Sequence, residues 1–148
     1  MFQSVMQSIF ITTIGIMIIG LVVPAFYPSD RKTNPLLSHF VIPIDSATAA
    51  RQAMVVSHLE TLLTQPHVQS DNIVLVAYDK GVHLLEQGNT FQARLQALIG
   101  NGVRCYACET SQAKLKDRLV LIEGVKKIAN GKQYIDTLME QGFTNSFA

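Results

Sequence analysis

The sequence lacks tryptophan, contains only two cysteines, and carries no long run of like-charged side chains. Lysine and arginine total 12 against 11 aspartates and glutamates, so the formal net charge is only +1. A protein that binds nucleic acid needs clustered positive charge to contact phosphates, and this chain has no basic stripe or block. We therefore expect no nucleic acid among its partners.

Charge is also absent from the first 29 residues, where the chain is strongly apolar. Residues 9–27 (IFITTIGIMIIGLVVPAFY) are long enough to cross a hydrocarbon core as a helix, and they are apolar all round. We predict a hydrophobic helix, as a membrane anchor or signal segment, over residues 1–27. Its amino end lacks the basic residues of a signal peptide, whereas Arg31 and Lys32 follow it. The protein is expected to be membrane-associated or exported, with the side of the membrane left open.

A polar, proline-bearing linker is predicted over residues 28–38, followed by one folded domain over residues 39–148. Apolar runs typical of strands alternate in this domain with amphipathic stretches typical of helices. The expected strands cover residues 40–44, 73–77, 103–107 and 125–128, and the expected helices cover residues 49–63, 91–99, 111–116 and 132–141.

This alternation predicts an α/β domain of three layers, in which a mainly parallel sheet carries helices on both faces. Sheets of this type place ligands and chemistry at the carboxyl ends of their strands. Three segments follow expected strands and should meet at that edge, namely residues 45–46, 78–81 and 108–111.

The two cysteines, Cys105 and Cys108, are spaced C-x-x-C within the sequence GVRCYACETS. A zinc site takes about four ligands, and this motif supplies two of them. The four histidines are scattered, and no second C-x-x-C occurs in the chain. We expect no metal site, and nothing in the sequence indicates a cofactor.

A redox pair is also disfavoured, because Cys105 lies within the expected strand and Cys108 follows three positions later. Their side chains should point to opposite faces of the sheet, whereas a disulfide needs β-carbons roughly 3.5–4.5 Å apart. We expect Cys105 to be a buried apolar side chain. Cys108 should gain thiolate character beside the start of the next helix, although Glu109 opposes this effect. The alternative is that Cys108 is an inert core thiol.

Three stretches of the domain carry further motifs: VLVAYDKGVHLL, RLQALIGNGVRCYACETSQAKL and VKKIANGKQYIDTLMEQGF. They contain a strand leading to a glycine loop, and a G-V-x-x-x-A-C segment with serine three residues after the cysteine. The turn IANG and a closing helix that ends in E-Q-G-F follow. In their order and spacing over residues 39–145, these motifs resemble the DsrE/DsrF-like family of sulfur-relay proteins.

The resemblance implies a three-layer α/β domain that assembles as a homo-oligomer, often a trimer or hexamer. It also implies a cysteine that accepts sulfur as a persulfide and passes it on, and the family's cysteine corresponds to Cys108. We therefore hypothesise a sulfur carrier or sulfurtransferase-like protein, whose partners are sulfur donor and acceptor proteins. Whether it acts as an enzyme is left undecided by the sequence.

In this hypothesis Cys108 is the nucleophile, because a thiolate rather than a thiol attacks a sulfane sulfur readily. The residues expected to support it are Ser111, Thr110, Lys80, Gly81 and His83. One alternative is a non-catalytic oligomeric binding module of the same fold, in which Cys108 only lines a pocket. A C-x-x-C thiol–disulfide redox protein is the less favoured alternative.

Overall fold

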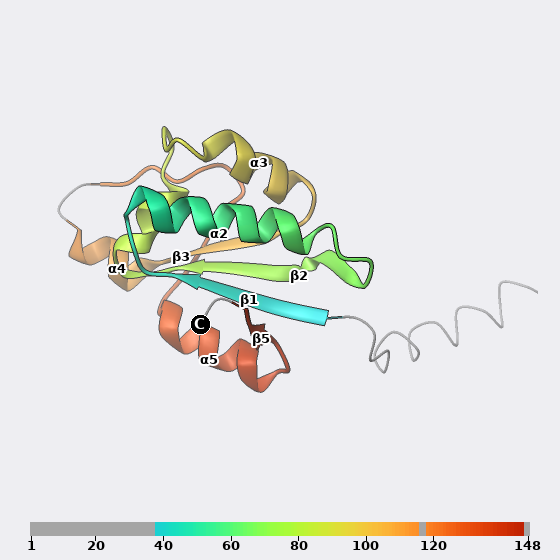
Figure 1. Ribbon diagram of the computed structural model, residues 1–148. Coiled ribbons are helices and arrows are strands. Elements are labelled where there is room, and N and C mark those ends of the chain that lie inside the picture. The colour runs from blue at the N-terminus through green and yellow to red at the C-terminus, as the bar shows by residue number, and fades with distance from the viewer. Residues whose placement is uncertain (1–37, 116–117, 147–148) are drawn as a thin grey trace, which may run out of the picture. The chain divides into compact units, whose positions relative to one another are not determined.

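A computed structural model of the protein describes residues 38–115 and 118–146 (Figure 1). The predicted N-terminal hydrophobic helix lies outside the described residues. Within them, no helix has the length and apolar character that crossing a bilayer requires. In chain order the elements are β1 (Ser38–Ile44), α2 (Ala49–Leu62), β2 (Val68–Ala77), the 3-10 helix η1 (Asp79–Leu85), α3 (Gln92–Gly100), β3 (Arg104–Cys108), α4 (Glu109–Lys114), β4 (Lys126–Ile128), α5 (Gly131–Glu140) and β5 (Thr144–Asn145).

The strands form one sheet in the order β4-β3-β2-β1-β5, and each pair of neighbouring strands is parallel. Helices α2 and α3 lie over one face of this sheet, and α5 lies over the other (Figure 1). The described residues therefore confirm the predicted α/β architecture with a parallel sheet between helices.

Successive side chains of each strand point to opposite faces of the sheet, so the core has two parts, one on each face. Leu75 and Cys105 belong to the larger part, which includes buried side chains of α2 and α3. Val74 belongs to the smaller part, where it packs with Ile135 and Leu138 of α5. Burying an aliphatic side chain of this kind contributes roughly 1.5–3 kcal/mol, so both helix layers hold the sheet in place.

Most differences from the sequence prediction concern the ends of elements. Strand β2 begins at Val68, five residues before its continuously apolar part. Helix α4 begins at Glu109 instead of Ser111, so Cys108 is both the last residue of β3 and the N-cap of α4. Elements η1 and β5 were not predicted, because both are too short for a periodic pattern to identify them.

Candidate functional site

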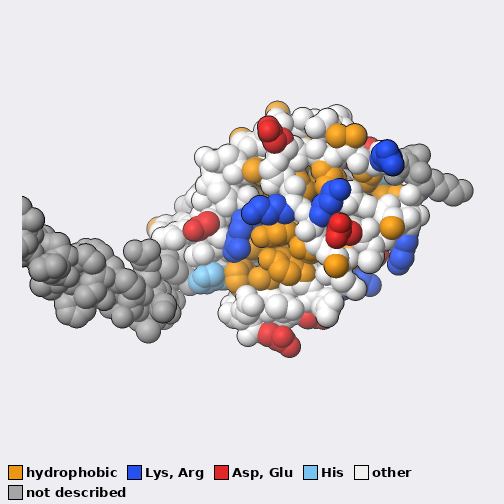
Figure 2. Space-filling view, turned by 180° about the vertical axis from the view of Figure 1, so that it is seen from behind, with side chains coloured by type: hydrophobic (Ala, Val, Ile, Leu, Met, Phe, Trp, Pro, Cys, Tyr) orange, Lys and Arg blue, Asp and Glu red, His pale blue; other side chains and the backbone are white. Residues whose placement is uncertain are grey.

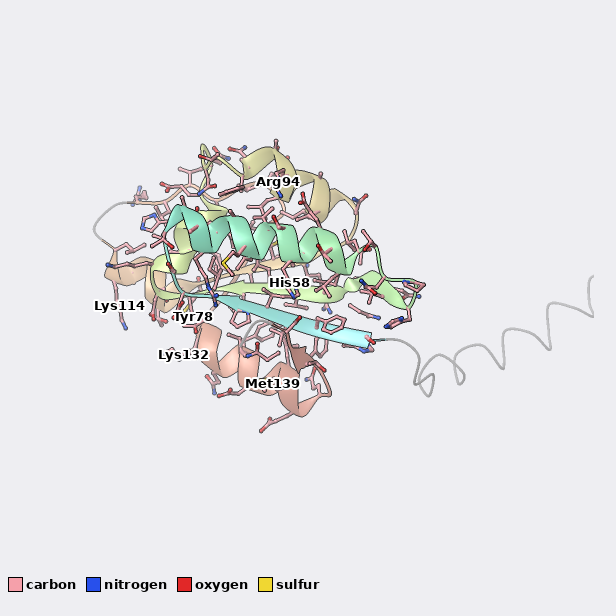
Figure 3. All side chains as sticks on the ribbon, in the orientation of Figure 1. His58, Tyr78, Arg94, Lys114, Lys132 and Met139 are labelled. Carbon is pink, nitrogen blue, oxygen red and sulfur yellow. The ribbon has the colours of Figure 1, made fainter. Side chains whose placement is uncertain are left out.

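A small pocket lies at the edge of the sheet where β2, β3 and β4 end, as expected for a parallel sheet. Its volume is about 120 Å³. Segments 78–81 and 108–111 both contribute to it, whereas residues 45–46 after β1 do not line it. Figure 3 shows Tyr78, Lys114 and Lys132 at this end of the molecule. The residues that line the pocket are Tyr78, Asp79, Cys108, Thr110, Ser111, Lys114, Asn130 and Lys132.

The Cys108 sulfur is held between the starts of two helices. Cys108 is the N-cap of α4, and its Sγ accepts a hydrogen bond of 3.1 Å from the backbone N–H of Gly131, the first residue of α5. The Thr110 hydroxyl lies 3.0 Å from the same sulfur. Because the first N–H groups of a helix lack partners within it, this position favours a negatively charged sulfur.

Gly131 brings α5 close to the thiol because it has no side chain. A β-carbon at this position would lie 3.2 Å from Cys108 Cβ and 3.0 Å from Tyr78 Cβ. Both distances are shorter than ordinary carbon–carbon contacts, so a larger residue would push the helix away from the sulfur. Gly131 was not among the predicted site residues, although it ends the turn IANG, one of the motifs that carry the family resemblance.

Ser111 links the cysteine to the loop after β2. Its side chain is buried, and its Oγ accepts a hydrogen bond of 2.7 Å from the backbone N–H of Asp79. Asp79 is the one non-glycine residue with a positive φ (48°) in the part of the chain that the structure describes. Aspartate tolerates this left-handed conformation better than most residues. With its oxygen accepting from Asp79, the Ser111 hydroxyl can donate its own hydrogen bond to Cys108.

These donors determine the acidity of Cys108. Burial raises the pKa of the thiol, whereas hydrogen bonds from the Ser111 and Thr110 hydroxyls and from the backbone N–H groups of Gly131 and Ser111 lower it. The hydrogen bonds outweigh burial, and the pKa falls from 9.0 to about 7. A substantial share of the Cys108 side chains is therefore thiolate at pH 7.

Cys105 has the opposite environment, although it lies only three residues away. It packs in the larger core with Leu75 and Ala107, on the other face of the sheet from Gly131. Burial raises the pKa of the Cys105 thiol to about 12. Both cysteines are free thiols, so the C-x-x-C motif holds two separate sulfurs. In the described part of the chain, no three His, Cys, Asp or Glu side chains gather where they could hold a metal ion.

The pocket carries both signs of charge, with cationic Lys114 and Lys132 opposed by anionic Asp79. The ammonium group of Lys132 lies 5.7 Å from the centroid of the Tyr78 ring, within reach of a cation–π interaction. Burial raises the pKa of Tyr78, and the charges of Asp45 and Asp79 raise it further. Tyr78 is therefore a neutral wall of the pocket at physiological pH.

Three of the predicted supporting residues lie in η1 and do not line the pocket. Lys80 is exposed, and His83 Nδ1 lies 3.4 Å from Glu86 Oε1. Gly81 is buried against the end of β1, where a β-carbon would lie 2.0 Å from the Ile44 carbonyl oxygen. Gly81 therefore holds the loop after β2 in position, while Thr110 and Ser111 contact the sulfur directly.

No protein-family model matches the chain, and no curated protein matches it. Solved structures that are similar to it include the following two. MTH1491 from Methanobacterium thermoautotrophicum, a protein of unknown function, aligns with a TM-score of 0.64 and 25% identity, covering 75% of this chain and 99% of that one. The ychN protein from E. coli aligns with a TM-score of 0.54 and 17% identity, covering 69% and 93%. The chain has a DsrE/DsrF-like fold.

The DsrE/DsrF-like fold accounts for the position of the site in this chain. Three parallel strands end side by side, and the turns that follow them bring Tyr78, Ser111 and Gly131 around Cys108. Because many functions occur on one fold, the fold by itself does not assign a reaction, and the chemistry has to be argued from the thiol and its neighbours.

Proposed function

We propose that this protein is a sulfur carrier of sulfurtransferase type, which holds sulfane sulfur as a persulfide on Cys108. The contrast between the two cysteines carries this proposal. One thiol has a pKa of about 7 and lies in a pocket, whereas the other has a pKa of about 12 and lies in the core. Cys108 thus has the thiolate character and the pocket position that a nucleophile requires.

The transfer step balances without an oxidant or reductant. The Cys108 thiolate attacks the outer sulfur of a donor persulfide, R–S–SH, and a new S–S bond forms at Sγ. The S–S bond of the donor breaks, and its electron pair leaves with R–S⁻. An acceptor thiolate later attacks the outer sulfur of the Cys108 persulfide in the same way. The N–H of Gly131 and the hydroxyl of Thr110 stabilise the Cys108 thiolate before the attack and after the release.

The two cysteines provide a matched pair of variants for testing the proposal. After incubation of the full-length protein with glutathione persulfide, we expect intact-mass spectrometry to show a gain of about 32 Da, one sulfur atom, in the wild type and in Cys105→Ala. Cys108→Ala should show no gain, because its remaining thiol is buried and neutral. Equal loading of Cys108→Ala, or loading of neither protein with an intact Cys108, would contradict the proposal.

We also propose that the protein functions as a homo-oligomer, a trimer or hexamer. Figure 2 shows the face of the molecule opposite to the one seen in Figure 1. Apolar side chains gather in the middle of this face, next to lysine and arginine side chains. Tyr106 and Tyr134, with ring centroids 5.0 Å apart, pack with Ile128 at the border of the smaller core and stay partly exposed. A second copy that covers such a surface would remove apolar area from water.

Chemical crosslinking of the full-length protein in detergent tests the assembly. We expect trimers or hexamers for the wild type and mostly monomers for Tyr134→Lys, which would bring a charge into the interface. Lys80→Gln, on an exposed loop, should behave like the wild type. A wild type that crosslinks only as a monomer would contradict the proposed assembly.

A further inference from the structure

The space above the Cys108 sulfur limits the size of a donor. Cys108 is only 2% exposed, so a sulfane sulfur has to enter the pocket to reach Sγ. The pocket volume of about 120 Å³ is well below the roughly 300–1,000 Å³ of pockets that hold drug-sized ligands. The reacting part of the donor must therefore be small.

The charges at the pocket favour a donor of negative charge. Lys114 lies on α4 and Lys132 lies on α5, the two helices whose first residues flank the thiol. Both lysines are exposed residues, and the Asn130 side chain joins them in the lining. Asp79 is the one acidic residue of the pocket lining, and it is also exposed. The two lysines therefore outnumber the acidic residues at the mouth of the pocket.

We propose that the sulfur donor of this site is a small sulfane-sulfur dianion of the thiosulfate class, bound between Lys114 and Lys132. The inference rests on the proposed function, because it assumes that Cys108 accepts sulfur. Five non-hydrogen atoms make up thiosulfate, and its sulfonate end offers oxygen acceptors to the two lysines and to Asn130. The lysines act as specificity-determining residues, since they bind the leaving group and do not contact the Cys108 sulfur.

The step balances for this donor as well. The Cys108 thiolate attacks the sulfane sulfur of thiosulfate, and the S–S bond within thiosulfate breaks. The electron pair of the broken S–S bond leaves with the sulfonate end, which becomes sulfite. The sulfane sulfur stays on Cys108 as a persulfide anion. The total charge is the same on both sides, and no external oxidant or reductant takes part. Sulfite carries two negative charges, so the lysines that bind the donor also stabilise the group that leaves.

A double variant of the full-length protein, Lys114→Gln with Lys132→Gln, tests the role of the two cations. We expect the rate of Cys108 persulfide formation from thiosulfate, followed by mass and by sulfite release, to fall roughly tenfold or more. Loading from glutathione persulfide should fall much less, within about twofold, because only the thiolate of its large leaving group lies at the pocket, whose volume of about 120 Å³ does not hold the rest of the glutathione molecule. Lys80→Gln, an exposed lysine outside the pocket, should load from both donors like the wild type.

Two alkylating agents of similar size provide a readout that is independent of sulfur transfer. Iodoacetate is an anion and iodoacetamide is neutral, so the ratio of their rates at Cys108 reports the charge of the pocket. We expect the double variant to lower this ratio about tenfold and Lys80→Gln to leave it unchanged. A change in the thiol alone would alter both rates equally.

The outcomes distinguish this inference from the proposed function. Loading from glutathione persulfide without loading from thiosulfate would overturn the dianion donor, favour a protein-borne persulfide, and leave the sulfur carrier intact. Equal thiosulfate rates in the wild type and the double variant would overturn the role of the lysines. Loading of Cys108 from neither donor would overturn the sulfur carrier itself.

Discussion

Replacing Gly81 by alanine should lower the free energy of unfolding by about 3 kcal/mol or more, the largest stability effect that we expect from adding one methyl group to this fold. The new β-carbon would lie 2.0 Å from the carbonyl oxygen of Ile44 and 2.9 Å from the backbone nitrogen of Asp45. Because these neighbours are backbone atoms, no side-chain rotation can relieve the contact. Urea unfolding of the full-length protein, followed by circular dichroism, measures the change.

Gly100→Ala is the matched control for this substitution. Gly100 ends α3, and a β-carbon there would meet no atom within 4 Å. We expect Gly100→Ala to be neutral or to stabilise the protein by about 0.5–1 kcal/mol, since alanine loses less backbone entropy than glycine in a helix. Equal stability of Gly81→Ala and Gly100→Ala would show that η1 is not seated against β1 as described.

The two cysteines should differ by at least about a thousandfold in alkylation rate in the native protein at pH 7, which is the largest chemical contrast that we expect. The pKa of Cys108 is lowered to about 7, so much of it is thiolate at this pH, whereas burial raises the pKa of Cys105 to about 12 and keeps its thiol neutral. The rate at Cys108 should rise with pH through a midpoint near 7, because its pKa is lowered below the ordinary thiol value. Peptide mapping after timed exposure to iodoacetamide measures both rates.

Thr110→Val tests why the alkylation rate of Cys108 should have its midpoint at a pH below that of an ordinary thiol. It removes a hydroxyl that lies 3.0 Å from the Cys108 sulfur and keeps the shape of the side chain. The pKa of Cys108 should rise, so the midpoint should move to higher pH and the rate at pH 7 should fall severalfold. A wild-type Cys108 that reacts no faster than a free thiol of pKa about 8.5 would instead favour the binding module.

The alternation of apolar runs and amphipathic stretches was enough to predict the parallel sheet and its two helix layers. The run from Ile73 to Ala77 is buried throughout, as its composition indicates for a central strand. Two-residue strand β5 was not predictable, because it depends on pairing with Phe40 and Val41 across the sheet and not on a local pattern. The N-terminal prediction stays a prediction, since it lies outside the described residues.

The candidate site was predictable as far as it depends on β3. Period-two alternation placed Cys105 and Cys108 on opposite faces, and the strand end placed Thr110 and Ser111 beside the sulfur. The contribution of Gly131 was not predictable in this way, because its amide reaches the sulfur from a helix 23 residues further along the chain. Lys80 was predicted as an electrostatic helper of the thiol, and it does not line the pocket.

In the proposed sulfur carrier, the sheet that separates the two sulfurs would also determine how sulfur can leave the protein. A persulfide on Cys108 has no second thiol within reach on its own face, because Cys105 is packed beneath the opposite helices. The chain cannot close an internal disulfide and expel sulfide by itself unless β3 comes apart. Each folded chain would therefore store a single equivalent of sulfur and retain it until an outside nucleophile arrives, so the acceptor and not the carrier would control the timing of delivery.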